Sequence, residues 1–237
     1  MTPLESALLL SLLAGLAIPA GGILAAFENL FPDWHRQEFH HAVMSFGGGA
    51  LLAAVAFVLV PEAIHETPIW AAVLSFFGGA IIFMRLDMLT QGSGNSLSQL
   101  LAMMLDFVPE AIALGAAFAL GHPMAGFLAF LIGIQNLPEG FNAYREVLAR
   151  PGAVRGKTLI AFFAISLIGP LAAFLGLQYF ANHLMVLNVL MLGSAGGIFY
   201  LVFQDIAPQA KLKDRWLPGF GAVCGFMLGV VGLMLTG

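Results

Sequence analysis

Eight apolar runs, each about as long as a membrane-crossing helix, fill almost the whole sequence. One helical span needs about 20 predominantly apolar residues. Hydrophobic residues make up 60% of the 237 positions and charged residues only 9%, so no segment is polar enough for a soluble domain. We therefore expect an all-α polytopic membrane protein, in which residues 1–237 form a single transmembrane domain of the cell (plasma or inner) membrane. The expected helices cover residues 4–27, 42–61, 69–89, 98–121, 123–144, 158–181, 184–205 and 216–236.

The rest of the composition excludes several other classes of protein. The single cysteine, Cys224, lies in the last apolar run, which excludes an internal disulfide framework and a thiolate metal cluster. The formal net charge is −4 and no basic block is present, so nucleic acid is excluded as a partner. Glu5 stands where the basic region of a signal peptide would lie, so we expect no such peptide.

Lysine and arginine occur only in or beside alternate loops. Eight of the nine basic residues lie in the first, fifth and seventh loops between the expected spans, the ninth, Arg85, lies near the third loop, and the other loops carry none. Positively charged residues stay on the cytoplasmic side of a membrane. This partition predicts that both termini lie outside. The basic residues are Arg36, Arg85, Arg145, Arg150, Arg155, Lys157, Lys211, Lys213 and Arg215.

Two of the spans share a pattern of small residues followed by a proline. Residues 47–50 (GGGA) precede Pro61 by the same interval that separates residues 194–197 (SAGG) from Pro208. The two spans cross in opposite directions, so the pattern predicts an inverted repeat around the 98–121 and 123–144 helices, a common plan for transporters. Chance similarity between glycine-rich helices is the alternative.

Three carboxylates lie in the middle of expected spans. Asp106 and Glu110 belong to the 98–121 helix and Glu139 to the 123–144 helix, whereas the other ten acids fall in loops or at expected helix ends. A charge at the bilayer centre costs about 2.5–3.5 kcal/mol on insertion scales. Three neighbouring anions also repel one another unless protons or a cation neutralise them. These acids are therefore candidates for a cation site.

The two acidic helices repeat one motif. Residues 106–111 (DFVPEA) and 135–140 (QNLPEG) each place an oxygen-bearing side chain, two intervening residues, a proline, a glutamate and a small residue in that order. Positions i and i+4 share one helix face, and the turn at residues 122–123 would bring both motifs to a similar depth. Oxygen ligands of this kind suit a divalent cation. The expected ligands are Asp106, Glu110, Gln135 and Glu139, with Asn136 beside them.

Other interpretations of the same side chains stay open. Asp106, Glu110 and Glu139 could form a structural network of protonated carboxyls, although no lysine or arginine lies near the middle of a span to pair with them. Gln135 and Asn136 could serve only as hydrogen-bonding groups between helices.

The order of these motifs resembles the ZIP family of metal-ion transporters. Paired proline-glutamate motifs on the fourth and fifth of eight spans, with both termini outside, are typical of that family. The resemblance extends to Pro61 and Glu62 at the end of the second span, Asp87, Gly169-Pro170 in the sixth span and residues 196–200 in the seventh. It implies a transport site for divalent transition metals such as zinc on the two acidic helices.

Several ligand positions of that family hold other residues here. Asp106 and Phe107 stand where the first motif usually has histidine and asparagine, and Gln135 where the second motif often has histidine. Gly169 replaces a glutamate found in many members, and Leu51 replaces a methionine found in some. The changes at 107 and 169 predict one metal site instead of a bridged pair. None of the six histidines lies in an expected span. Because a carboxylate replaces an imidazole at the site, the metal preference should move from zinc toward manganese, iron(II) or another hard divalent ion.

We therefore expect transmembrane transport of divalent transition-metal cations of the zinc, manganese or iron(II) class, in the family's usual direction toward the cytoplasm. The expected partners are the divalent metal ion and the lipid bilayer, with a homodimer left open, and no cofactor is expected besides the transported ion. One alternative is a transport-deficient metal sensor or structural protein, motivated by the missing ligands. The other, an intramembrane metal-dependent enzyme, lacks a Ser/His pair or an arginine near the acids, so an enzyme is not expected.

Overall fold

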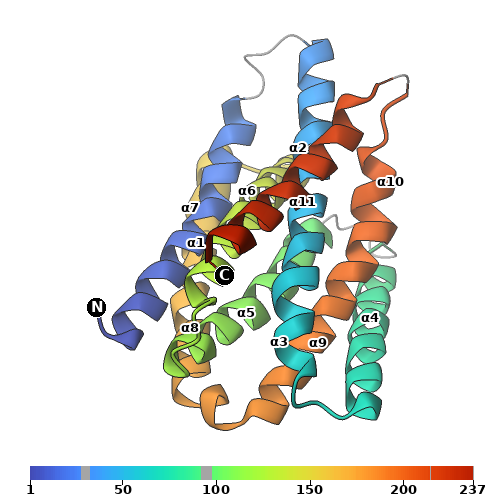
Figure 1. Ribbon diagram of the computed structural model, residues 1–237. Coiled ribbons are helices and arrows are strands. Elements are labelled where there is room, and N and C mark those ends of the chain that lie inside the picture. The colour runs from blue at the N-terminus through green and yellow to red at the C-terminus, as the bar shows by residue number, and fades with distance from the viewer. Residues whose placement is uncertain (28–32, 92–97, 214, 237) are drawn as a thin grey trace.

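Eight helical rods make up the described part of the chain (Figure 1). The computed structural model describes residues 1–27, 33–91, 98–213 and 215–236, which form helices and turns without a strand. The all-α fold class expected from the sequence is confirmed. The rods are α1 (Pro3–Phe27); α2 (Asp33–Ala54), continued by η2 (Val55–Leu59) and α3 (Val60–Ile64); α4 (Ile69–Gln91); α5 (Ser98–Ala119); α6 (Ala125–Leu148); α7 (Arg155–Ser166), continued by α8 (Ile168–Gln178) and η3 (Phe180–Asn182); α9 (Leu184–Leu201), continued by η4 (Val202–Ile206) and α10 (Ala207–Ala210); and α11 (Leu217–Thr236).

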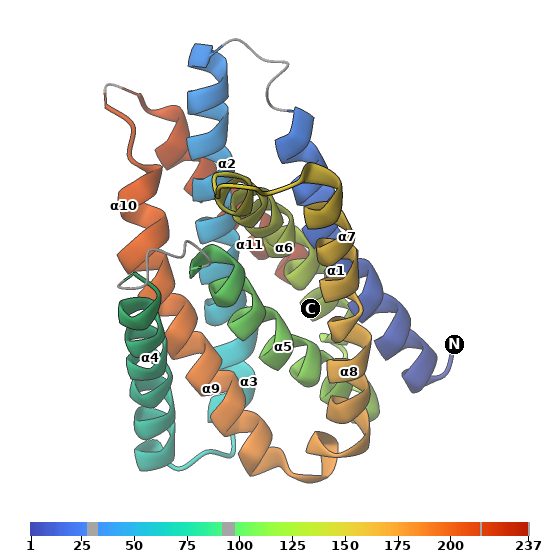
Figure 2. The ribbon, with the colours of Figure 1, turned by 180° about the vertical axis from the view of Figure 1, so that it is seen from behind.

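Six of these rods are long and apolar enough to cross a membrane. They are the rods that begin with α1, α2, α4, α7, α9 and α11. The other two, α5 and α6, lie among the remaining helices (Figure 2), and a crossing by them stays a prediction. In α6, Gln135, Asn136 and Glu139 interrupt the apolar sequence. Polar residues of this kind in a membrane helix face other helices and not the lipid.

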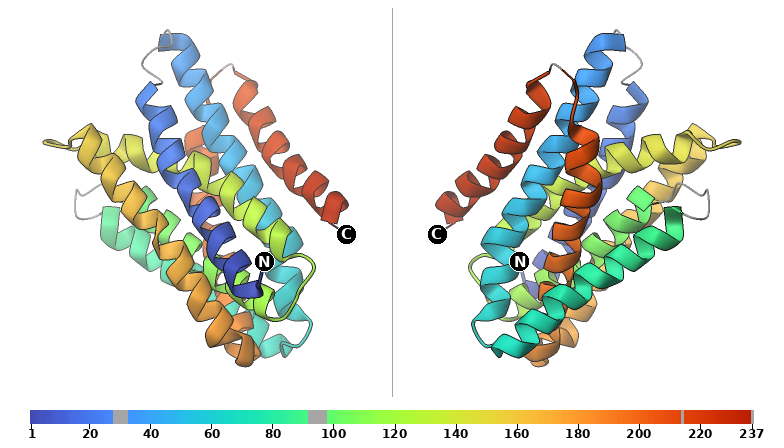
Figure 3. Two further views of the ribbon diagram at one scale, coloured as in Figure 1. Left: turned by 90° about the vertical axis from the view of Figure 1, so that its left-hand side faces the viewer. Right: turned by 90° about the vertical axis from the view of Figure 1, so that its right-hand side faces the viewer.

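The helices pack as two groups. The first group contains α1 and α5–α8, in which α1 lies along α6 and α5 along α8. The second group contains α2–α4 and α9–α11, in which α2 lies along α11 and α4 along α9 (Figure 3). The groups meet where α2 contacts α6 and where α5 contacts α9.

Glycines bring the helices of the second group into backbone contact at matching places. A Cβ on Gly49 of α2 would overlap the carbonyl oxygen of Ala222 in α11, and a Cβ on Gly196 of α9 would overlap that of Phe76 in α4. Small residues allow this approach between membrane helices. Gly49 and Gly196 are each the third residue of the repeated motif, so the motif makes equivalent helix contacts at both places, and the inverted repeat itself stays a prediction.

A π-helical turn marks the same point in both halves of the repeat. η2 begins eight residues after Gly47 and ends two residues before Pro61, and η4 begins eight residues after Ser194 and ends two residues before Pro208. A proline has no backbone N–H to donate, which favours such an irregular turn just before it. The prolines of the motif thus place a local irregularity at equivalent depths.

Two rods extend further than the apolar runs predict. The second rod begins at Asp33, so His40 and His41 lie in a helix and within the candidate span that starts at Gln37; the expectation that no histidine lies in a span is wrong. The rod containing α9 continues to Ala210, so Asp205 lies within a span and not at its end. Hydropathy marks only the apolar part of a helix, whereas the backbone hydrogen bonds continue into more polar sequence.

Candidate metal site

The acidic motifs of α5 and α6 face each other because the chain reverses tightly between the two helices. Gly121 in this reversal has a φ of 67°, a conformation that glycine adopts without strain. The backbone N–H of His122 donates to the carbonyl of Ala117 (2.9 Å), which closes the end of α5. Pro109 and Pro138 both lie inside continuous helices.

A buried hydrogen bond joins the two motifs. The Nε2 atom of Gln135 donates to Oε2 of Glu110 over 2.5 Å, and neither residue is exposed to solvent. Their other oxygens, Gln135 Oε1 and Glu110 Oε1, are buried without a hydrogen-bond partner. The structure therefore brings these two expected ligands together and leaves an acceptor atom on each.

Asp106 and Glu139 form the second pair. Their carboxyl groups lie within hydrogen-bonding reach of each other, and a hydrogen bond between them requires a proton on one of the two groups. Asp106 is 2% exposed, and its Oδ1 and the Oε2 of Glu139 are buried without partners. The carboxylate of Glu110 is close enough to interact electrostatically with both residues. Four of the five expected ligands thus form one connected cluster.

Asp106 and Glu139 line a small cavity of about 20 Å³ where the two helix groups meet. Its remaining wall comes from Met103 of α5, Leu51 of α2, and the rod formed by α9 and η4. A cavity of this size holds about one water-sized sphere. A small ion fits such a space better than an organic substrate does.

In the part of the chain that the structure describes, no three histidine, cysteine, aspartate or glutamate side chains are arranged to coordinate a metal. The three carboxyl groups of the proposed set, Asp106, Glu110 and Glu139, are therefore not arranged to coordinate an ion as they stand. Their oxygens bond to neighbouring members of the set instead of converging on one point. Coordination would require those bonds to be exchanged for bonds to the ion.

Asn136 turns away from this cluster. Its Nδ2 donates to the carbonyl of Ala14 in α1 (3.0 Å), whereas its Oδ1 is buried without a partner. The amide nitrogen therefore has the interhelical role left open from the sequence. A ligand role for the oxygen stays a prediction.

Phe107 and Gly169, two of the departures from the ZIP pattern, lie against each other. Its ring is fully buried, and a Cβ on Gly169 of α8 would lie 2.6 Å from its Cζ. A Cβ on Gly15 of α1 would lie 3.0 Å from the same atom. The two departures from the ZIP pattern, at 107 and 169, are therefore sterically matched to each other.

Asp205 lines the same cavity as Asp106 and Glu139, although it is not among the ligands expected from the sequence. In the sequence it falls near an expected helix end, where interfacial solvation explains it and a role in an entry or exit path is the alternative. The missed signal is the motif itself, because residues 205–210 (DIAPQA) repeat the order of oxygen side chain, two residues, proline, amide or acid, and small residue. Its position in the π-helical turn η4 also fits a functional role, since such turns are frequent at functional sites.

Comparison with known proteins gives matches along nearly the whole chain. The protein named Zinc transporter ZupT of Chlorobium phaeovibrioides is 24% identical, with 99% of each chain covered. The proteins of the same name from Chlorobium limicola and Lysinibacillus sphaericus are 24% and 23% identical, and the alignments cover 97% and 95% of this chain and 96% of each relative. No protein-family model matches the sequence. The matches to these transporters confirm the resemblance to the ZIP family that the motifs indicate.

Proposed function

We propose that this chain carries divalent transition-metal ions across a membrane through a single site between α5 and α6. Asp106, Glu110, Gln135 and Glu139 bind the ion, and Asn136 lies beside them. The observation that carries the proposal is the buried cluster of three carboxyl groups and one amide, with unpartnered oxygens on each. No described lysine or arginine pairs with these acids, so a cation is the missing counter-charge.

Binding would exchange a proton for the ion. The hydrogen bond between Asp106 and Glu139 needs a proton, which a dication would displace while neutralising much of the charge of the carboxylates. Glu110 would turn its unpartnered Oε1 to the ion while Gln135 holds its Oε2. Metal uptake is therefore linked to proton release at this site.

The position of the cavity suggests how the ion is exposed. Asp106 and Glu139 belong to the first helix group, whereas Leu51 and Asp205 in the facing wall belong to the second. Movement of one group against the other would open the cavity to either side of the membrane in turn. Asp205 would be the next oxygen ligand along this path, and the ion would move toward the cytoplasm.

Zinc is one candidate ion, because the relatives are named zinc transporters. The ligand atoms proposed here are all oxygens, which favours harder ions such as manganese or iron(II) more than a histidine-rich site would. We therefore propose that the transported ion is a divalent transition metal, with zinc, manganese and iron(II) as the candidates.

Uptake by proteoliposomes tests the proposal. Purified protein is reconstituted and offered zinc, manganese, iron(II), cobalt and cadmium, with Glu110→Ala and Glu139→Ala as site variants. Glu66→Ala is the matched control, because Glu66 is an exposed acid between α3 and α4. We expect metal uptake to fall at least about tenfold in the site variants, because mutating even the residues that support metal ligands costs about that much. Uptake by the control should be normal.

Uptake that survives both site substitutions would rule out this site. Binding of metal without uptake of any ion would instead favour the metal sensor considered above. Formation of a lipid or peptide product would favour the enzyme.

A further inference from the structure

A groove outside the metal site lies between α2, the rod of η4 and α10, and α11. Its volume is about 600 Å³, within the roughly 300–1,000 Å³ typical of clefts that hold a ligand. Small residues form much of its floor, including Gly48, Gly49, Ala207 and Ala222. The groove is therefore a recess between helices and not simply an apolar outer surface.

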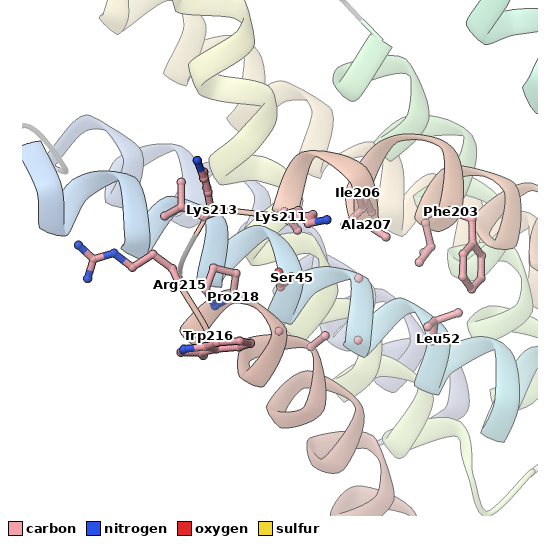
Figure 4. A pocket seen from close by; sticks show the side chains of 17 residues that line it. Ser45, Leu52, Phe203, Ile206, Ala207, Lys211, Lys213, Arg215, Trp216 and Pro218 are labelled. Carbon is pink, nitrogen blue, oxygen red and sulfur yellow. The ribbon is translucent and has the colours of Figure 1, made fainter.

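The groove has a basic end and an apolar end (Figure 4). Lys211, Lys213 and Arg215 gather at one end, next to the ring of Trp216, whereas Leu52 and Phe203 lie at the other. Trp216 is 88% exposed and Phe203 is 57% exposed. Tryptophan is enriched at the headgroup level of membranes, so the basic end belongs at a membrane surface and the apolar end within the hydrocarbon.

The two lysines are available for an anion. Arg215 lies 3.7 Å from the carboxylate of Glu38, so part of its charge is already balanced. Both lysines are exposed, and within the described residues neither forms an ion pair with a carboxylate. Among the described residues, the groove thus has an excess of positive charge at one end and apolar walls at the other, which suits a molecule with a negatively charged head and an apolar tail.

We propose that this groove binds an anionic membrane phospholipid. The headgroup phosphate lies against Lys211 and Lys213, and one acyl chain follows the groove past Ser45 toward Leu52 and Phe203. Basic pockets between membrane helices bind anionic headgroups in this way. Ile206 borders both the groove and the cavity at Asp106 and Glu139, so the bound lipid contacts the wall of the metal site.

Fluorescence quenching of Trp216 tests the proposal without any transport measurement. Trp34 and Trp70 are replaced by phenylalanine, so that Trp216 is the only tryptophan. The full-length protein is placed in phosphatidylcholine vesicles containing increasing fractions of phosphatidylglycerol with brominated acyl chains. Brominated phosphatidylcholine in the same fractions is the headgroup control. We expect phosphatidylglycerol to quench at a much lower fraction, and equal quenching by the two lipids would overturn the proposal.

Two variants and one control locate the binding. Lys211→Gln/Lys213→Gln should weaken the preference for phosphatidylglycerol by roughly fivefold for each lysine, the effect expected of one cation near an anionic lipid. Gly219→Phe should reduce quenching by both lipids, because Gly219 lines the groove and a Cβ there meets no atom within 4 Å. Arg85→Gln/Arg155→Gln removes equal charge outside the groove and should change nothing.

A headgroup preference that survives removal of both lysines would contradict the assigned phosphate position. A preference lost equally in the Arg85/Arg155 control would show only general attraction to an anionic surface and would also contradict the groove. Protection of Trp216 by a second copy of the chain, seen as a dimer with no quenching by either lipid, would assign the groove to a protein interface instead.

Discussion

The ring of Phe107 occupies the space in front of Gly169. A Cβ on this glycine would lie 2.6 Å from Phe107 Cζ and 2.9 Å from the carbonyl oxygen of Ser11. An aromatic ring on α5 and the absence of a side chain on α8 therefore form one packing unit at the position where the ZIP pattern has two polar groups. Neither position offers a polar side chain to an ion, which supports the proposal of a single-ion site.

Gly169→Ala should destabilise the protein by about 1–3 kcal/mol, the usual cost of adding a methyl group to a packed core. Thermal unfolding in detergent measures the change. Gly78→Ala is the matched control, because Gly78 also lies within a span and a Cβ there meets no atom within 4 Å. Adding Phe107→Leu to Gly169→Ala should recover part of the loss. Equal stability of the Gly169→Ala and Gly78→Ala variants would contradict the packing described above.

The number of bound ions should change when the two departures are reversed. Equilibrium dialysis of the wild-type protein against radioactive zinc or manganese should give one ion per chain. Phe107→Asn/Gly169→Glu replaces the ring and the glycine with the polar groups of the ZIP pattern and should raise the number toward two. Two ions per wild-type chain would show that Phe107 does not exclude the second site.

Much of the fold follows from the sequence because the bilayer allows few solutions. Apolar runs of span length must form helices whose backbone groups are satisfied internally, so the rods lie close to the expected ranges. The ends of the rods containing α2 and α9 could not be predicted from hydropathy, because a helix can continue beyond the last apolar residue into polar sequence.

The candidate site was predictable in part for a similar reason. Acids in the middle of a span have few structural explanations, which singled out Asp106, Glu110 and Glu139. The amide of Asn136 could not be assigned from spacing alone, because its hydrogen bond is to Ala14, far away in sequence. Asp205 was not among the expected ligands, because an acid near an expected helix end has an ordinary explanation in solvation, and only the packing of the rods brings it to the cavity.

The two helix groups should need to move relative to each other during transport. Leu51 of α2 and Met103 of α5 line one cavity from opposite groups. In a Cys224→Ala background, cross-linking Leu51→Cys to Met103→Cys with a short bifunctional thiol reagent should stop metal uptake, and a cleavable linker should allow its recovery.

The control for this experiment is a cross-link within the second group. Phe57 and Phe226 have ring centroids 5.2 Å apart, so Phe57→Cys and Phe226→Cys can be joined by the same reagent. Uptake should continue in this variant. Unchanged uptake after complete cross-linking of the Leu51/Met103 pair would contradict movement at the boundary.

The most direct test of the account is a change of ion selectivity at Glu139, because loss of uptake alone could also come from misfolding. In the Cys224→Ala background, Glu139→Cys replaces a hard carboxylate with a soft thiolate, which favours cadmium over manganese. The measurement is the ratio of cadmium to manganese uptake by proteoliposomes. If Glu139 binds the transported ion, this ratio should rise severalfold while uptake of cadmium is retained. Retained uptake of both ions in an unchanged ratio would contradict the proposal that the ion passes through this site.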